Sequence, residues 1–322
     1  MATTTTARKP ATRKPAAKTR KPAREVTTDD GLPMLDGKLD RKALLLAALE
    51  MPGSISQAFN AFHRYSFLNM LLVFMQTGKA EPMGNFNAWK RKGRNVIKGQ
   101  KALFVNHPVP VYKRDEAGNV VKDKDGKSVI AFVKFIPKAT VFQLSQTDGP
   151  DLVYPALPDW DKEQALANLG ITEVPFKMAD GNVQGYSFED KLAMNPVATQ
   201  AMATMIHEIA HIVLGHTAKD KQADYAQHRG LMEFQAEAVA LLVCKELDVP
   251  GYDEAESRGY IQQWLGSATS DYTEWDEDAG DTALVEDSTV TAIFNAVDKI
   301  LVAGRKAHFD ALKDAEDAEA TA

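Results

Sequence analysis

The stretch "MIHEIAHIVLGH", residues 205–216, holds three of the seven histidines of this 322-residue chain. Its apolar residues recur at helical spacing, which predicts a buried amphipathic helix: Ile206, Ile209, Ala210, Val213 and Leu214. A buried helix tolerates polar side chains only where they have partners, because an unpaired polar group in apolar surroundings costs free energy. The polar side chains of this helix, His207, Glu208 and His211, therefore require a partner.

A metal ion is a partner that two imidazoles can share. Residues four apart lie on one face of a helix, so His207 and His211 can bind the same ion. Glu208 lies beside them, where its carboxylate can accept a proton from water. This His-Glu-x-x-His arrangement predicts one Zn²⁺ per chain, with Mn²⁺ or Co²⁺ as substitutes, and Glu208 as catalytic base. The alternative interpretation is a pair of hydrogen-bonded core histidines.

A catalytic zinc site needs a third protein ligand and an open position. The apolar stretch "GLMEFQAEAVALLV", residues 230–243, predicts a second helix that carries Glu233 and Glu237 on one face. One of the two would bind the metal and the other would orient a histidine, and spacing alone does not choose between them. His216 lies at the end of the first helix, where the helix dipole favours a histidine, and it is not expected to be a ligand.

The loop between the two helices contains three residues that could stabilise an oxyanion. These are Tyr225, His228 and Arg229. The short strand around Tyr186 could bind an extended peptide along its edge.

The N-terminal half contains a cationic segment with interleaved aromatic residues. Residues 79–101 carry seven Lys or Arg against one acid, Glu81. Proteins that bind single-stranded DNA combine a cationic groove with aromatic platforms on which bases stack. The predicted DNA contacts are Phe86, Trp89, Lys90, Arg91, Lys92, Arg94, Lys98 and Lys101. The alternative is that Phe86 and Trp89 belong to the core and the cations form a solvated face.

The net charge of −6 is unevenly distributed. Residues 1–24 contain eight Lys or Arg and no acid, in repeated units rich in Pro, Ala and Thr. Such a composition predicts a disordered basic tail, either a solubilising segment or a tether to nucleic acid through counterion release. The absence of long apolar runs and of a secretory signal predicts a cytoplasmic protein with no membrane partner. Cys244, the sole cysteine, is expected to be a buried, inert thiol.

Periodicity and turn signals predict an α+β fold. Two helices are expected within residues 40–78, broken at Pro52-Gly53, followed by β-rich runs at 103–112, 128–136 and 139–144. After a connection at 147–163 we expect a helix at about 161–169, a hairpin near 185–194 and a helix that opens at Asn195-Pro196 and ends at Gly215. Further helices are expected at about 231–247, 253–266 and 287–313.

The chain resembles a known group of proteins in both halves. "HEIAHIVLGH" followed by "EFQAEAVALLV" resembles the ImmA/IrrE and ArdC group of gluzincin-like metallopeptidases. In their Glu-x-x-Ala pattern the first glutamate is the metal ligand, which implies Glu233 as the ligand and leaves Glu237 to orient a histidine. "RYSFLNMLLVFMQ", "FNAWKRKGRNVIKGQKALFV" and "KATVFQLSQTDG" resemble the ArdC anti-restriction proteins of plasmids and phages. In that family this half binds single-stranded DNA.

The resemblance covers about residues 40–305 and implies two domains, while the composition of the two ends predicts a tail on each side. We expect a disordered basic tail (1–37), an α+β single-stranded-DNA-binding domain (38–150), a mostly helical zincin-like metallopeptidase domain with a small sheet (151–312) and a disordered acidic tail (313–322).

The expected function is that of a DNA-associated zinc metallopeptidase of a plasmid or phage. It would bind single-stranded DNA and hydrolyse an unidentified protein substrate, in anti-restriction or protection of incoming DNA. One alternative is a non-proteolytic protein that coats single-stranded DNA and uses the metal only for structure. The other is a regulator that cleaves a repressor.

Overall fold

The computed structural model describes residues 26–27, 30–51, 53–154, 156–178, 180, 182–221, 228–271 and 285–321. The basic segment 1–24 and Tyr225 lie outside these ranges. Residues 30–37, which we assigned to a disordered tail, contain part of a small antiparallel hairpin of β1 (Met34–Leu35) and β2 (Lys38–Leu39).

Three helices follow: α1 (Arg41–Glu50), α2 (Ser56–Phe59) and α3 (Phe67–Thr77). The Asp40 side chain accepts a hydrogen bond from the backbone N of Ala43 and so caps α1. The prediction of one continuous helix after Pro52-Gly53 is wrong, because the chain turns between α2 and α3. The Asn60 side chain accepts from the backbone N of Tyr65 at 2.8 Å and closes that turn.

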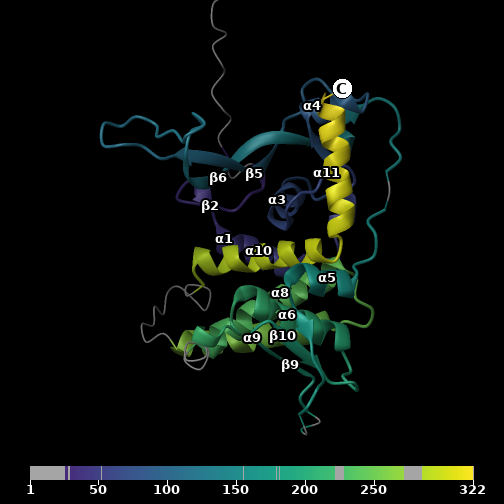
Figure 1. Ribbon diagram of the computed structural model, residues 1–322. Helices are drawn as coiled ribbons and strands as arrows, with labels where there is room; N and C mark the ends of the chain where they lie inside the picture. The colour runs from purple at the N-terminus through teal and green to yellow at the C-terminus, as the bar shows by residue number, and fades with distance from the viewer. Residues whose placement is uncertain are drawn as a thin grey trace, which may run out of the picture.

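A three-stranded antiparallel sheet packs beside these helices. Its order is β3 (Met83–Asn85), β6 (Ile130–Gln143) and β5 (Leu103–Tyr112). Strand β6 joins two predicted runs into one, and with β5 it forms a ribbon that extends away from the body (Figure 1). Pro108 and Pro110 lie in β5, which is an edge strand, the place where a missing backbone N–H is tolerated. Shorter elements complete this half: α4 (Phe86–Arg91), β4 (Asn95–Val96), the 3₁₀ turn η2 (Leu144–Gln146) and β7 (Thr147–Asp148).

The second half begins with α5 (Lys162–Leu169) and a small sheet. Strand β10 (Lys191–Met194) lies between β8 (Thr172–Glu173), which is parallel to it, and β9 (Gly185–Phe188), which is antiparallel. The predicted hairpin is therefore confirmed, and β9 is an edge strand of this sheet.

The two helices predicted to hold the metal are α6 (Ala201–Leu214) and α8 (Arg229–Glu246). The start predicted for the first is wrong by five residues, because Asn195 caps a turn instead, with its side chain accepting from the backbone N of Val197 at 3.1 Å. Its predicted end is confirmed: Gly215 has a left-handed φ of 82°. The turn η3 (Lys219–Lys221) follows α6, and α9 (Glu254–Asp271) packs along α8.

The C-terminal helix predicted at 287–313 is two helices, α10 (Asp287–Ala303) and α11 (Lys306–Thr321). The break lies at Gly304, where a Cβ atom would stand 2.5 Å from Nε1 of Trp160. Trp160 donates to the backbone O of Ile300 at 2.9 Å, so the indole fixes the end of α10. The prediction of a disordered acidic tail is therefore wrong, because residues 313–321 continue α11.

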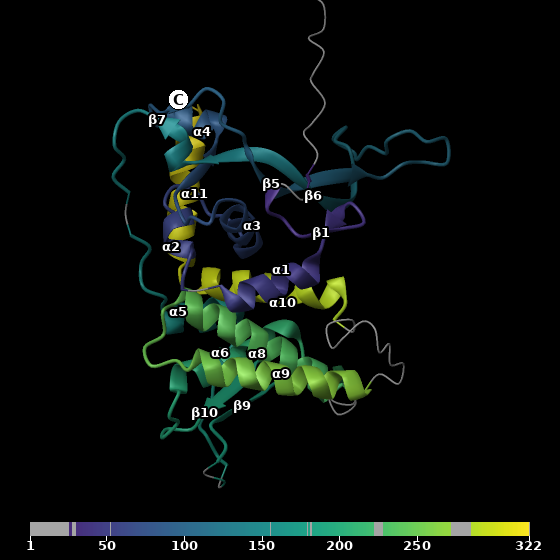
Figure 2. The same cartoon turned by 180° about the vertical axis from the view of Figure 1, so that it is seen from behind.

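Helix α10 lies between the two halves (Figure 2). Its apolar side chains are buried against α1 and α3 on one side and α6 and α8 on the other: Val290, Ile293, Phe294, Val297 and Ile300. One hydrophobic cluster consequently runs through both halves. The fold is mixed α and β, as the sequence predicts, and the division into two domains stays a prediction.

Cys244 is buried in α8, as expected, and burial raises the pKa of its thiol. Among the described helices, none combines the length and apolar character that crossing a bilayer requires.

Candidate metal centre and cationic cavity

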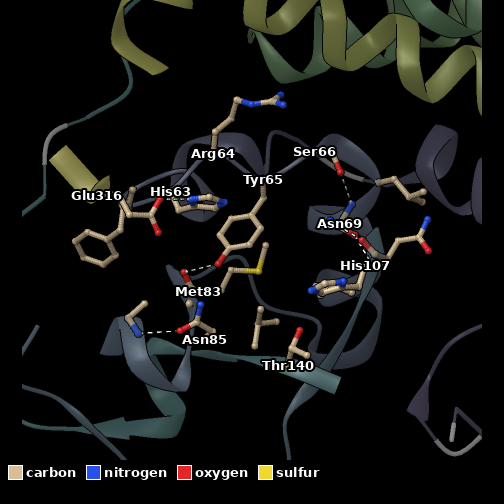
Figure 3. Close-up of a pocket in the computed structure, with 18 of the residues that line it drawn as sticks. His63, Arg64, Tyr65, Ser66, Asn69, Met83, Asn85, His107, Thr140 and Glu316 are labelled. Carbon is tan, nitrogen blue, oxygen red and sulfur yellow. Dashed lines mark hydrogen bonds and ion pairs between the residues drawn. The ribbon is translucent and has the colours of Figure 1, made fainter. Parts of the chain in front are cut away.

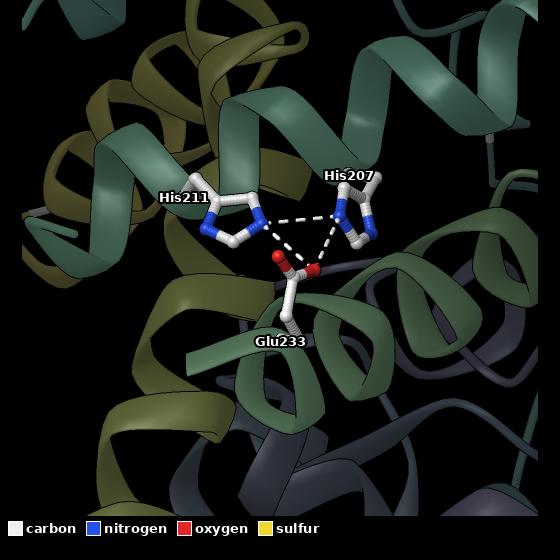
Figure 4. A group of neighbouring side chains, drawn as sticks. All are labelled: His207, His211 and Glu233. Carbon is white, nitrogen blue, oxygen red and sulfur yellow. Dashed lines mark hydrogen bonds and ion pairs between the residues drawn. The ribbon is translucent and has the colours of Figure 1, made fainter. Parts of the chain in front are cut away.

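Helices α6 and α8 bring His207, His211 and Glu233 together (Figure 4). Glu233 Oε2 lies 3.4 Å from His207 Nε2 and 3.5 Å from His211 Nε2, and the two Nε2 atoms are 3.1 Å apart. One potential ligand atom from each residue thus lies within 4.8 Å of the others. Two imidazoles and a carboxylate form the donor set of catalytic zinc sites.

The partners of the two histidines show which ring nitrogen would face a metal. His207 Nδ1 lies 2.9 Å from Glu237 Oε2, a carboxylate that can only accept, so Nδ1 carries a proton. Glu237 is itself held by the Ser257 hydroxyl of α9. The Nε2 lone pair of a neutral His207 therefore points at Glu233 and His211, which is the orientation a ligand needs.

His211 is oriented by two successive hydrogen bonds that the sequence did not indicate. His216 Nε2 donates to Gln235 Oε1 at 2.9 Å, which leaves its Nδ1 to accept from His211 Nδ1 at 3.0 Å. This requires a neutral His216, and burial together with the neighbouring His211 lowers the pKa of His216 to about 4. We assigned His216 to the helix dipole; it is buried and positions His211 instead.

Burial alone would lower the pKa of His207, but its contacts with Glu233 and Glu237 outweigh burial and raise the pKa to about 10. At neutral pH the imidazole is therefore protonated, and a metal must displace that proton. We expect the affinity for Zn²⁺ to rise about tenfold for each pH unit between about 6 and 8 and to level off only near the His207 pKa. Chelator competition at several pH values measures this. Equal affinity at the two ends of the range would contradict it.

Glu208 projects from α6 toward β9. Its Oε2 accepts from the Ser187 hydroxyl at 2.5 Å, which anchors the carboxylate to this strand. Glu208 is close enough to His207 that its charge contributes to the raised pKa of that imidazole. Ser187 was missed by sequence reasoning, since no motif contains it. The period of two along a strand places Tyr186 and Phe188 on the opposite face, where their rings stack at 6.2 Å.

The proposed oxyanion donors remain predictions. Tyr225 lies outside the described residues, and His228 is the residue before the first turn of α8. Arg229 Nε lies 3.7 Å from Glu233 Oε1, so this guanidinium neighbours the carboxylate of the cluster.

Two of the predicted DNA contacts are corrected by the structure. Trp89 is 1 % exposed and donates through Nε1 to the backbone O of Phe142 at 2.9 Å, so no base can stack on it. Arg94 is also buried and donates to Thr147 and to the carbonyls of Gly149 and Pro150. Both residues hold the fold of this half together.

The other predicted contacts are accessible. Phe86, Lys90, Lys98 and Lys101 are exposed, and Arg91 and Lys92 border a cavity of about 960 Å³. This cavity lies between the N-terminal half and helices α10 and α11 (Figure 3). Its aromatic and cationic lining includes Phe62, His63, Arg64, Tyr65, His107, Phe135 and Tyr154. All seven lie outside the segment 79–101, which is why the charge pattern of that segment did not point to them.

Comparison with known protein families shows which family the N-terminal half resembles. The model of the N-terminal domain of anti-restriction factor ArdC matches residues 47–142. That part of the chain, from the end of α1 through β6, is ArdC-like, which confirms the resemblance seen in its sequence.

Longer similarities are weaker. An uncharacterized protein of Bacillus anthracis is 27% identical over 284 residues, which is 74% of this chain and 46% of that protein. The chain thus spans less than half the length of this relative. The crystal structure of the antirestriction protein ArdC from plasmid R388 in its metal-free form has a TM-score of 0.47 at 19% identity and covers 85% of this chain and 95% of that one. The Mn(II)-bound form has a TM-score of 0.45 at 17% identity, covering 82% and 96%.

Proposed function

We propose that this chain binds single-stranded DNA through its ArdC-like half and hydrolyses peptide bonds at the cluster of His207, His211 and Glu233. The observation that carries the peptidase half is the convergence of those three side chains next to Glu208. A general base has no use beside a purely structural metal. The likeness of residues 47–142 to an anti-restriction domain supports a role in protecting DNA that enters a host cell.

Zn²⁺ is the expected ion, with Mn²⁺ or Co²⁺ as substitutes, and when bound it would supply Lewis-acid polarisation of the scissile carbonyl. Glu208 takes a proton from the attacking water and passes it to the leaving amine. The Ser187 hydroxyl holds the Glu208 carboxylate in place for both transfers. The open edge of β9 offers backbone groups that can pair with an extended peptide beside this carboxylate.

A direct test is to incubate the zinc-loaded chain with the proteins of a bacterial extract and to identify newly formed N-termini by labelling. Reactions with and without single-stranded DNA show whether DNA presents the substrate. New N-termini that depend on metal support the proposal. Their absence in both reactions would contradict the peptidase half and leave DNA binding to be judged separately.

DNA binding makes its own prediction. Phe86 is 55 % exposed at the start of α4, among the accessible lysines. Base stacking on such a ring contributes roughly 1–3 kcal/mol, so Phe86→Ala should weaken binding by about 5- to 100-fold with little change in salt dependence. Lys98→Ala and Lys101→Ala should each flatten the log–log salt slope by roughly 0.7. Fluorescence anisotropy of a labelled oligothymidylate measures both effects.

The matched control for Phe86 is Phe188→Ala, which removes an exposed ring from the other half of the chain. It should bind DNA as the unmodified chain does. Unchanged binding by Phe86→Ala would remove α4 from the DNA-binding surface.

A further inference from the structure

Helix α11 is an acidic helix that lies along the ArdC-like half, beside α4 (Figures 1 and 2). Residues 306–322 contain five acids, Asp310, Asp314, Glu316, Asp317 and Glu319, against two lysines. One face of α11 forms a wall of the cavity through Leu312, Ala315 and Glu316.

Glu316 connects α11 to a histidine and an arginine of the opposite wall. Its Oε2 lies 2.6 Å from His63 Nδ1, and its Oε1 lies 4.0 Å from an amino group of Arg91 (Figure 3). Both partners line the cavity, one at the turn before α3 and the other on α4. A single carboxylate therefore spans the two elements that the ArdC-like half presents to the cavity.

Helix α10 repeats this pattern deeper in the cavity. Asp298 accepts from Arg64 at 2.9 Å, and the Thr291 hydroxyl accepts from Arg41 at 2.7 Å. Three arginines and one histidine of the N-terminal part thus line the cavity and pair with acceptors supplied by the C-terminal helices. A phosphate oxygen is also an acceptor and could pair with the same donors.

The N–H groups of arginine and histidine donate hydrogen bonds to phosphate oxygens as they do to carboxylate oxygens. The pairs of Glu316 are partly exposed to solvent, and exposed ion pairs contribute little to stability. A DNA strand also gains from the release of its counterions when cations take up its phosphates. A strand can therefore replace Glu316 at modest cost.

We propose that α11 is a displaceable acidic cover of the cavity. In the covered state the Glu316 carboxylate occupies the positions on His63 and Arg91 that phosphates of bound single-stranded DNA would otherwise occupy. Single-stranded DNA and α11 compete for the same side chains. This inference rests on the proposed DNA binding and adds the regulation of that site.

The test compares two charge-removing substitutions on one helix, made in the full chain. Glu316→Gln frees His63 and Arg91, whereas Asp310→Asn removes a carboxylate that pairs with Lys306 on the solvent side of α11. Binding of a labelled oligothymidylate should tighten roughly two- to fivefold for Glu316→Gln. Its log–log salt slope should steepen by roughly 0.7, because the guanidinium of Arg91 becomes available to a phosphate. Asp310→Asn should match the unmodified chain. Equal effects of the two substitutions, or weaker binding by Glu316→Gln, overturn the cover.

A second experiment uses a cross-link to hold α11 against the cavity. His63→Cys combined with Glu316→Cys gives two accessible thiols, while the native Cys244 is buried and does not react. After joining by a short bismaleimide the chain should bind DNA more weakly than the same variant before reaction. Equal binding before and after overturns the inference. Failure of the unmodified chain and of every variant to bind DNA would instead refute the proposed DNA binding itself.

Discussion

Glu208→Gln is expected to lower the rate of peptide-bond hydrolysis by about 10²–10⁴-fold, the usual effect of losing a general base. The amide has the size of the carboxylate but cannot accept the proton of the attacking water. Glu208 is not one of the three clustered side chains that would bind the metal, so metal content should be unchanged. DNA affinity should also be unchanged, because no residue of α6 lines the cavity. The rate is measured on a substrate identified by its new N-termini.

Glu189→Gln is the matched control for this substitution. Glu189 directly follows β9 and pairs with Lys191 and Lys219 at the surface, so the same change of charge occurs near the site without touching the reaction. It should keep full activity. If Glu208→Gln also keeps its activity, Glu208 is not the base.

The same variant separates the two roles of the protein. Loss of protection of incoming DNA along with proteolysis would assign the biology to the peptidase. Full protection by Glu208→Gln would show that coating of single-stranded DNA suffices.

His211→Ala is expected to abolish metal binding after dialysis, since it removes one of three ligands and leaves Glu233 facing His207 alone. Glu233→Ala should weaken binding strongly for the same reason. His216→Ala should have a smaller effect, about 10- to 100-fold in affinity, because His216 only orients His211. Metal content is measured by elemental analysis and affinity by chelator competition.

His308→Ala provides the control, because this histidine lies on α11 and packs beside Phe309, away from α6 and α8. It should retain its metal. Retention by His211→Ala together with loss in His216→Ala would show that the ligand assignment is wrong.

The metal cluster was predictable because its evidence is local. Two histidines one turn apart in an apolar helix share a face whatever surrounds them, and a second apolar helix with two glutamates needs only to pack alongside. Spacing could not choose between Glu233 and Glu237; the resemblance chose Glu233, and the structure places it in the cluster. Ser187 and His216 could not be found in this way, since their roles depend on how the chain folds back.

The errors have non-local causes. Trp89 resembles a stacking platform among lysines, yet its ring is buried by contact with Phe142, 53 positions away in the sequence. Residues 287–313 read as one helix because the apolar period continues, whereas Trp160 ends α10 from 140 positions away. Periodicity describes the face of an element and carries no information about what will pack against it.

The packing of α10 against both halves predicts that they unfold as one cooperative unit. Because its buried side chains contact α3 above and α8 below, unfolding of either half would uncover apolar surface on the other. A ligand that binds only the folded state stabilises everything that unfolds with its site, by mass action. Metal held between α6 and α8 should therefore protect the ArdC-like half against heat and denaturant. DNA bound in the cavity should likewise protect the region around α6 and α8 against heat and denaturant, although the two sites share no residue.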